Sequence, residues 1–364
     1  MLKYAPAVFA VEKNYQIMAL VTAECLFWVK VGDKTYYDHS NGVLRSAENI
    51  HRVTLPMSEL DGAGEYTVCI RPIIERKSYW SQTSDVIEKR FAFRPLPEGD
   101  FRAYHVSDAH NRIDGPIAAG KVFGDIDLLI LNGDIVENSG NLEHFDTIYA
   151  IASALTGGSI PIVFSRGNHD TRGIYAEALE RYCPTANGRS YYTFRMGSLW
   201  GIVLDCGEDK TDDHEEYGNT MACHGFRQEE TEFIRSVVAR ASEEYAAEGV
   251  ERRLVVIHRP FTLPCKPLYD IEKDTYGEWR RLVAEEIRPD VLIGGHFHRI
   301  EVIRPGDPSI NGDHPCTIVL GGKPGSGPYT EAPWFAGCGY DFTSEGISVT
   351  FTDCEGKVLG TEKI

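Results

Sequence analysis

The first 94 residues contain short hydrophobic or alternating runs, and none of them has helical periodicity. Turn-forming sequences such as Ser40-Asn41-Gly42 and Asp61-Gly62 separate these runs. The runs cover residues 7–11, 15–21, 26–31, 34–37, 66–71 and 86–93. Short strands at this spacing are typical of an antiparallel β-sandwich. We therefore predict a small all-β domain over residues 1–94.

One strand pattern indicates the type of this β-domain, and the segment after the domain is predicted to be a linker. Residues 62–69, followed by Arg71-Pro72, resemble a late strand of an immunoglobulin or fibronectin type III sandwich. Residues 95–100 read Pro-Leu-Pro-Glu-Gly-Asp. Prolines restrict the backbone, so this stretch is expected to be a stiff polar linker.

After residue 100, strand-like hydrophobic runs alternate with segments of helical spacing. The predicted strands cover residues 101–107, 128–132, 161–165, 254–257 and 291–293, and the predicted helices cover 142–155, 226–245 and 276–287. Beyond residue 298 strand patterns dominate, ending in 346–351 and 358–364. Helices between apolar strands predict a mostly parallel sheet covered on both faces, with a second sheet packed against the first. Residues 101–364 should form one α/β domain.

The charge balance limits the partners. The chain has 364 residues and a formal net charge of −17. Such an acidic surface repels nucleic acid polymers and anionic membranes, so neither is expected as a partner. A small phosphorylated substrate is still compatible, because local cations can outweigh the global field. The predicted β-sandwich is a candidate surface for oligomerisation or for a protein partner.

The start of the chain and its cysteines bear on location. The first residues lack a hydrophobic stretch of signal-peptide length, and no run reaches the roughly 18 apolar residues of a membrane span. Nine cysteines are scattered without a C-x-x-C pair, which is typical of reduced thiols. We therefore expect a cytoplasmic protein.

Polar residues that can bind metals follow five of the predicted strands. They occur in Asp108-Ala109-His110, in Gly133-Asp134, in Gly167-Asn168-His169-Asp170, at His258, and in Gly295-His296-Phe297-His298. In an α/β sheet, binding sites form beyond the carboxyl ends of the strands. A single histidine or aspartate at such an end is usually structural. Five at successive strand ends predict a shared site.

The residue types indicate which ions such a site would hold. Carboxylate, amide and imidazole ligands without thiolates favour Mn, Fe, Zn or Co. Gly133, Gly167, Gly294 and Gly295 are expected to permit backbone conformations that a Cβ would forbid, so that the chain can wrap tightly around the ions.

In order and spacing these motifs resemble the calcineurin-like metallophosphoesterase superfamily, over roughly residues 101–320. The resemblance implies a four-layer α/β fold, a β-sandwich flanked by helices. A preceding small all-β domain is similar to the layout of the purple acid phosphatases. The resemblance also implies two metal ions (Mn, Fe, Zn or a mixed pair) and phosphoester hydrolysis by a hydroxide that bridges them.

The resemblance also implies a role for each residue. Asp108, His110 and His298 would hold the first metal, and Asn168, His258 and His296 the second. Asp134 would bridge both. His169 would protonate the leaving alkoxide or stabilise the phosphoryl charge. Asp170 or Glu137 would orient the His169 ring.

The sequence departs from known subfamilies at a few positions. Purple acid phosphatases have a metal-bound tyrosine three residues after the bridging aspartate, where this chain has Glu137. Arg166 precedes the Asn168 motif, as an arginine does in protein Ser/Thr phosphatases, and is a candidate phosphate contact or a structural residue. That family has a further arginine where this chain has Asn138, which we take as a second candidate substrate contact.

Three further segments leave alternatives open. Arg259 either approaches the substrate or forms a salt bridge in the scaffold. Residues 321–329 are rich in glycine and are expected to form a substrate-side or structural loop rather than a nucleotide-binding loop. The acidic stretch 208–216 should be a solvated loop, whose side chains could line the cleft.

The sequence therefore predicts a dinuclear metal-dependent phosphoesterase that acts on small soluble substrates. Phosphomonoesterase and phosphodiesterase activities share the same ligands and cannot be separated here. The alternatives are a catalytically silent binding or scaffold protein of the same fold and a protein Ser/Thr phosphatase-like enzyme. A silent member would be expected to lack His169 or several ligands, and all of them are present.

Overall fold

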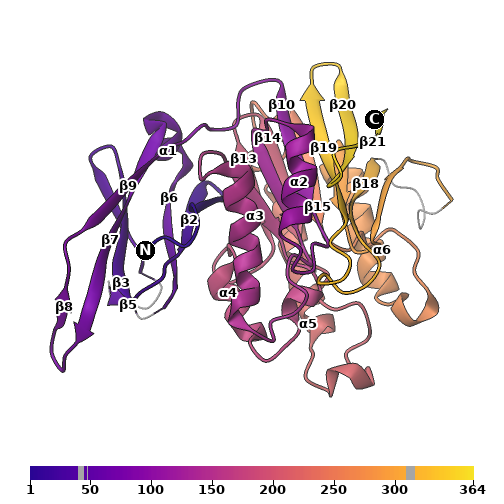
Figure 1. Ribbon diagram of the computed structural model, residues 1–364. Coiled ribbons are helices and arrows are strands. Elements are labelled where there is room, and N and C mark those ends of the chain that lie inside the picture. Colours follow the sequence, from indigo (N-terminus) through magenta and orange to yellow (C-terminus); the bar gives the residue numbers. More distant parts are fainter. Residues whose placement is uncertain (40–44, 47, 309–315) are drawn as a thin grey trace.

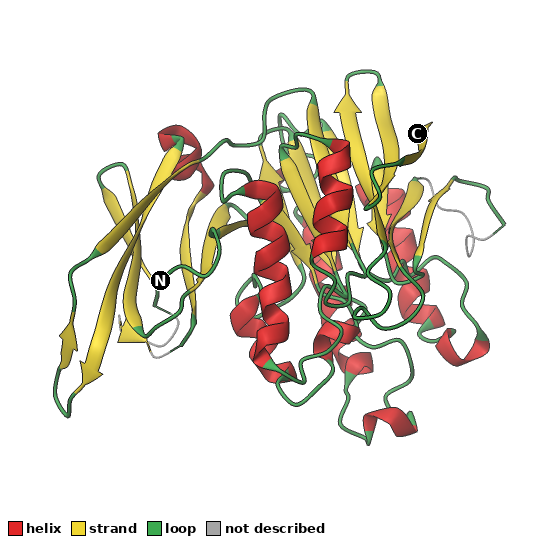
Figure 2. Ribbon diagram, in the orientation of Figure 1, coloured by secondary structure: helices red, strands yellow, loops and turns green. Residues whose placement is uncertain are grey.

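A computed structural model describes residues 1–39, 45–46, 48–308 and 316–364 (Figures 1 and 2). The predicted turn at residues 40–42 lies outside the described residues. A small β-rich part containing the N-terminus lies at one side of a larger body in which helices cover sheets. No helix in the described part of the chain is long and apolar enough to cross a membrane.

In the residues that the structure describes, the β-rich part contains nine strands and one short helix. They are β1 (Ala7–Val11), β2 (Asn14–Leu20), β3 (Cys25–Val31), β4 (Lys34–Tyr37), β5 (Arg45–Ser46), β6 (Ile50–Pro56), α1 (Met57–Ala63), β7 (Glu65–Arg76), β8 (Ser81–Thr83) and β9 (Ile87–Ala92). One sheet has the order β4-β3-β7-β8, with β5 on β3 and β9 on β7. Its inner residues, such as Phe27 and Val68, share a core with Ile17 and Val53 from β2 and β6. The predicted sandwich is therefore present.

The larger body begins at Phe101. Its strands are β10 (Phe101–Val106), β11 (Leu128–Asn132), β12 (Ile162–Ser165), β13 (Tyr192–Met196), β14 (Leu199–Leu204), β15 (Arg252–Ile257), β16 (Val291–Gly294), β17 (Arg299–Ile303), β18 (Thr317–Pro324), β19 (Phe335–Thr343), β20 (Gly346–Asp353) and β21 (Val358–Lys363). Its α-helices are α2 (Asp114–Phe123), α3 (Asp146–Thr156), α4 (Leu179–Tyr182), α5 (Cys223–Ala239) and α6 (Lys273–Arg281), and a π-helical turn, η7 (Leu282–Ile287), continues α6.

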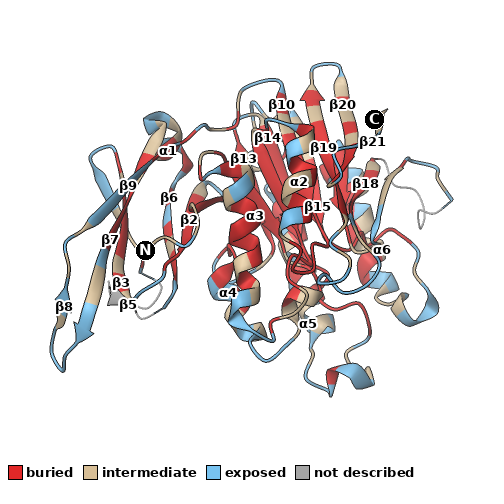
Figure 3. Cartoon of the chain, viewed as in Figure 1, coloured by how far each residue is buried: buried red, intermediate tan, exposed pale blue. Residues whose placement is uncertain are grey.

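Alternation along the buried strands produces four layers. Ile130 on β11 faces a core that it shares with Val256 on β15. The next residue, Leu131, faces a second core containing Ile148 of α3. On the other side, Ile257 packs with Trp279 of α6. The order is therefore helices, sheet, sheet, helices, which confirms the predicted four-layer fold; Figure 3 shows the buried strands at its centre.

The strands of the two central layers belong to one continuous sheet, and this sheet does not stop at the predicted domain boundary near residue 95. Its strand order is β13-β14-β15-β16-β18-β19-β10-β11-β12-β1-β2-β6. Phe9 of β1 pairs with Ile162 of β12 in parallel. The strands β1, β2 and β6 thus form one layer of the small sandwich and also extend the sheet of the larger body beyond β12. The division at residues 94 and 101 stays a prediction.

Several predicted elements differ from the observed ones at their ends. The helix predicted over 226–245 ends at Ala239, and the helix predicted over 142–155 begins at Asp146, after a 3-10 turn (Leu142–Phe145). The pattern did not predict α2, because its sequence Asp-Gly-Pro-Ile-Ala-Ala-Gly-Lys-Val-Phe contains two glycines and a proline. Packing of Ala119 and Phe123 on the sheet stabilises this helix despite its low propensity.

Candidate metal centre

Five strand ends place the predicted ligands at one edge of the layered sheets. Asp108 follows β10, Asp134 follows β11, Asn168 follows β12, His258 follows β15 and His296 follows β16. Backbone hydrogen bonds join these ends directly: the amide of His110 donates to the carbonyl of Asp134 (2.9 Å), and that of Gly295 donates to His258 (2.8 Å). Residues distant in sequence therefore converge because their strands are neighbours.

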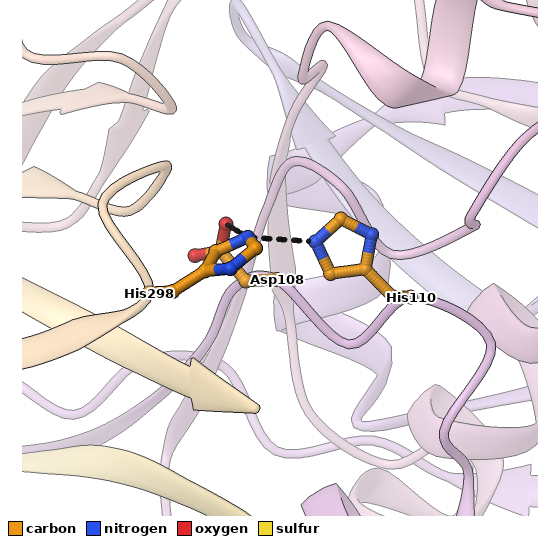
Figure 4. Close-up of side chains that lie close together, drawn as sticks. All are labelled: Asp108, His110 and His298. Atoms are coloured by element: carbon orange, nitrogen blue, oxygen red, sulfur yellow. Dashed lines mark hydrogen bonds and ion pairs between the residues drawn. The ribbon is translucent and has the colours of Figure 1, made fainter. Parts of the chain in front are cut away.

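Asp108, His110 and His298 form the first cluster, shown in Figure 4, with one ligand atom from each within 4.8 Å of the others. The Nε2 atoms of His110 and His298 lie 3.0 Å apart, and Nε2 of His298 lies 3.5 Å from Oδ1 of Asp108. Asp108 is fully buried, and its carboxylate accepts the hydroxyl of Ser107 (2.7 Å) and the amide of His296 (3.0 Å).

Asp134, His258 and His296 form the second cluster, again with ligand atoms within 4.8 Å of one another. Nε2 of His258 lies 3.0 Å from Oδ2 of Asp134. Oδ1 of Asp134 accepts the backbone amide of His169 (2.8 Å). Oδ1 of Asn168 lies 3.0 Å from Nδ1 of His296, so the predicted amide ligand joins this cluster.

The protonation pattern of these groups fits bound cations. Nδ1 of His258 donates to the carbonyl of Asn132 (2.8 Å), so Nε2 is the ring nitrogen that faces the site, 3.0 Å from Oδ2 of Asp134. Two imidazole nitrogens that face each other at 3.0 Å, as in His110 and His298, repel unless a proton or a cation lies between them. Buried imidazole and carboxylate groups of this kind suit divalent transition metals.

The electrostatics of the protein without metal show the same need for positive charge. Burial lowers the pKa of His258, but the carboxylates of Asp134 and Asp108 outweigh it and raise this pKa to about 10. Burial acts to raise the pKa of Asp134, and the charge of His258 reverses the shift, so this pKa is lowered. Burial and the charge of His258 lower the pKa of His296 to about 3. A proton on His258 thus takes the place of a cation.

The ligand loops are held in an unusual backbone conformation. Five of the seven predicted ligands, Asp108, His110, Asp134, His296 and His298, have positive φ angles, between 46° and 69°. Non-glycine residues pay about 1–3 kcal/mol each for such strained conformations, which gather at functional sites. The surrounding strands hold this strain in place, and the ligands are positioned in advance of any binding.

The glycines of the motifs act mainly through close packing, which differs from the expectation. Gly133 has the predicted left-handed conformation (φ +72°), and a Cβ there would lie 2.6 Å from Cβ of His258. Gly167 has no positive φ, but a Cβ on it would overlap Oδ1 and the amide nitrogen of Asp134. Gly294 and Gly295 likewise lack positive φ and are restricted by neighbouring side chains.

His169 lies beside the first cluster with a defined tautomer. Its ring lies edge-on to His110, 4.7 Å between centroids. An arginine N–H can only donate, so Nε2 of His169 accepts from Nη1 of Arg172 (3.3 Å). Nδ1 then donates to the backbone carbonyl of Glu137 (2.9 Å). The predicted orienting partner Glu137 therefore hydrogen-bonds to His169 through its backbone, and its carboxylate lies 2.9 Å from Nδ1 of His110 and 3.9 Å from Nδ1 of His169.

Asp170 does not contact the His169 ring in the described interactions. Its buried carboxylate accepts the backbone amides of Asp134 (3.0 Å), Val136 (3.3 Å) and Gly167 (2.8 Å). The predicted orienting role thus does not match this geometry. Asp170 instead ties the Asp134 loop to the Asn168 loop, and burial next to Asp134 raises its pKa to about 7.

The two predicted substrate contacts, Arg166 and Asn138, both interact with neighbouring groups of the protein. Nε of Arg166 pairs with Oδ2 of the buried Asp205 (2.6 Å), and its guanidinium lies over the ring of Phe226 (5.2 Å). Its side chain is still 24% exposed and lines a cavity, so both readings of Arg166 stay open. Oδ1 of Asn138 accepts the amide of Gly140 (2.9 Å) within its own loop.

The acidic stretch 208–216 is only partly the solvated loop that we expected: residues 211–216 are exposed or half-buried, whereas its first three residues are buried. Glu208, Asp209 and Lys210 are buried, and both oxygens of Glu208 pair with Arg172, at 2.8 Å and 2.7 Å. The sequence did not single out Arg172. Its position three residues after His169 is the one feature of the sequence that could have indicated a role near that histidine. Its carboxylate partner, Glu208, lies 36 residues away in the sequence.

Two further expectations can be compared with the structure. Arg259 is buried and donates to the carbonyl of Tyr269. Its predicted salt bridge is not found among the described residues, and its approach to a substrate stays a prediction. Residues 321–324, expected as a loop, belong to β18, and a Cβ on Gly322 would lie 2.6 Å from Oδ2 of Asp108. The loop proper begins at Gly325 and is held by Arg112, which donates to three of the carbonyls over residues 325–332.

Comparisons with known proteins agree with this geometry. The family model described as calcineurin-like phosphoesterase matches residues 101–299, which is more than half of the chain. A protein of Fibrobacter succinogenes named "Probable cyclic nucleotide phosphodiesterase" is 26% identical over 84 residues, which cover 23% of this chain and 31% of that protein. The match thus spans less than a third of that relative.

Solved structures share the fold. Purple acid phosphatase PPD1 from yellow lupin superposes with a TM-score of 0.60 at 12% identity, covering 99% of this chain and 74% of that one. The structure of PhoD superposes with a TM-score of 0.53 at 11% identity, covering 100% and 90%. Both likenesses include the small β-rich part as well as the layered body. At these identities they show a common fold.

Proposed function

Since this chain belongs to the calcineurin-like phosphoesterase family, we propose that it hydrolyses phosphate esters of small soluble molecules with the help of two metal ions. One observation carries the proposal: seven side chains from five strand ends converge, and Nε2 of the buried His258 lies 3.0 Å from Oδ2 of the buried Asp134. An imidazole nitrogen and a carboxylate oxygen at this distance repel unless a proton or a cation lies between them, and a bound metal ion would take that place.

Each side chain has a part in the proposal. Asp108, His110 and His298 would hold one ion, and Asn168, His258 and His296 the other, with Asp134 between them. Two bound divalent ions supply neutralisation of phosphoryl charge and ionisation of water near neutral pH. We take the ions to be Mn, Fe, Zn or a mixed pair.

His169 would act at the leaving oxygen. Its Nε2 carries a lone pair in the observed tautomer, because Nδ1 holds the proton that it donates to the carbonyl of Glu137. Protonation of a leaving alkoxide therefore requires that Nε2 first take up a proton from solvent or substrate. With the proton in place, Nε2 becomes a donor and the hydrogen bond from Arg172 must break.

Monoesters and diesters both fit the proposal. The name of the Fibrobacter succinogenes relative supports a diester, and the name of the yellow lupin structure supports a phosphatase. The net charge of −17 favours small substrates over nucleic acid polymers.

The test is hydrolysis of p-nitrophenyl phosphate and bis(p-nitrophenyl) phosphate by the full chain loaded separately with Mn, Fe and Zn. We expect metal-dependent turnover of at least one ester. His169→Ala should lower kcat by about 100-fold or more while the metal content stays unchanged. His224→Ala, at an exposed histidine away from the cluster, is the matched control and should keep full activity.

Two outcomes oppose the proposal. A protein that binds no transition metal would remove the basis for the site. A protein that binds two ions yet cleaves no mono- or diester would favour a scaffold of the same fold.

A further inference from the structure

A cavity of about 720 Å³ lies next to His169, and nothing in the metal centre accounts for it. We call it the Arg172 cavity. Its wall contains Arg166, Arg172, Met221, Ala222 and Phe226, together with parts of the acidic stretch. Arg172 links it to the candidate centre, because Nη1 of this residue lies 3.3 Å from Nε2 of His169. His169 itself does not line the cavity, so the guanidinium of Arg172 is the contact that joins the two.

The charged groups of this wall, apart from the exposed Glu177, are neutralised by their own neighbours. Arg172 pairs with both oxygens of Glu208, and Arg166 pairs with Asp205. Glu216 pairs with Nζ of Lys210 at 3.0 Å. A guanidinium already held by a buried carboxylate has little charge to offer an anionic ligand. The wall is therefore unsuited to a leaving group that carries further phosphates or carboxylates.

Part of the remaining wall is apolar, next to the polar side chains of Thr171, Tyr217 and Thr220. Met221, Ala222 and Phe226 come from the segment before α5 and from its first turn, and Met221 and Phe226 are only half-buried. One face of Phe226 lies under the guanidinium of Arg166, and its ring also meets Tyr191 at 5.5 Å. Methionine and aromatic side chains adapt well to a flat apolar ligand.

From these observations we infer that the Arg172 cavity receives the leaving group of the substrate, and that this group is an uncharged organic moiety with an apolar ring. The inference rests on the proposed function, and it narrows the substrate to phosphate esters of uncharged, ring-bearing alcohols. Buried apolar area then contributes to binding at about 25 cal/mol per Å² of ring surface removed from water.

The experiment compares two pairs of probes on the Mn-loaded full chain. Calorimetry measures the binding of 2-phenylethylphosphonate and ethylphosphonate, which cannot be hydrolysed. Turnover is measured with 2-phenylethyl phosphate and ethyl phosphate, whose alkoxides have similar basicity. We expect the dissociation constant of the phenyl-bearing phosphonate and the KM of the phenyl-bearing ester to be lower than those of the ethyl probes by a factor of about ten or more.

Ala222→Trp fills the cavity from an exposed wall position and should reduce the tenfold preference to less than twofold. Gly225→Trp is the matched control, because it adds the same bulk on α5 at an exposed glycine with open space around it and outside the cavity wall. This variant should keep the full preference.

The outcomes separate the inference from the proposed function. Equal binding of the two phosphonates, binding of neither, or a preference that survives Ala222→Trp would overturn the inference. A phosphonate preference without turnover of either ester would retain the cavity assignment and remove the proposed function. Turnover of both esters at equal efficiency would retain the function and remove the inference.

Discussion

Replacement of Gly167 by alanine tests whether close packing sets the geometry of the site. Gly167 stands one residue before Asn168, and its backbone is not in the left-handed region, so alanine adds no backbone strain. The added Cβ would overlap the amide nitrogen and Oδ1 of Asp134 and would lie 3.0 Å from its Cγ, which is closer than the ordinary contact range of 3.4–4 Å. The perturbation is therefore purely steric and acts on one predicted ligand.

Asp134 cannot move away freely. Its Oδ1 accepts the amide of His169 and its own amide donates to Asp170. Relief of the overlap requires a shift of the loop, and overpacking of this kind costs about 1–3 kcal/mol of stability. A ligand displaced by about 1 Å lowers the rate by about 100-fold.

The assays are the free energy of unfolding in urea, metal affinity by calorimetry and kcat/KM on an ester that the wild-type protein cleaves. Gly225→Ala on α5 is the matched control, since nothing lies within 4 Å of its Cβ position. It should stabilise the protein by about 0.5–1 kcal/mol. If Gly167→Ala kept wild-type metal affinity and activity, the packing argument would be wrong.

Three further changes test the site. Mn²⁺ at 100 times its dissociation constant should stabilise the protein by about 2.7 kcal/mol in thermal unfolding, and Asp134→Asn should remove most of this gain; equal gains in both would exclude Asp134 as a ligand. Asp170→Ala leaves three backbone amides without an acceptor and should cost about 3 kcal/mol or more by urea unfolding, whereas a loss below 1 kcal/mol would contradict its tying role. Arg112→Met releases the carbonyls over residues 325–332, so limited proteolysis should cut there several times faster than in the wild-type protein; an unchanged cleavage rate would show that other contacts hold the loop.

The positions of the ligands could be read from the sequence because two simple rules coincide there. Apolar runs such as 128–132 predict buried strands, and polar residues directly after them, such as Asp134, must lie at the sheet edge. The alternation of strands and helices predicted a sheet covered by helices on both faces, and the four-layer arrangement came from the resemblance to the calcineurin-like superfamily. Both rules depend only on local sequence.

Other features depend on contacts that local sequence does not specify. Arg172 and Glu208 are 36 residues apart and meet because the ends of β12 and β14 lie near one another. The role of Asp170 depends on which backbone amides surround it, and so its sequence position beside His169 was misleading. Positive φ at His296 has no sequence signal, because only glycine, asparagine and aspartate commonly adopt it.

The pairing of β1 with β12 has a consequence for how the protein is made. Phe9 leaves the ribosome about 150 residues before its neighbour Ile162, and the strand of Ile162 leads directly into the Asn168 loop. The start of the chain must therefore wait, unpaired on that side, until the middle of the chain emerges. Contacts of such long sequence separation slow folding, and the assembly of the candidate metal centre is expected to be a late event of biosynthesis.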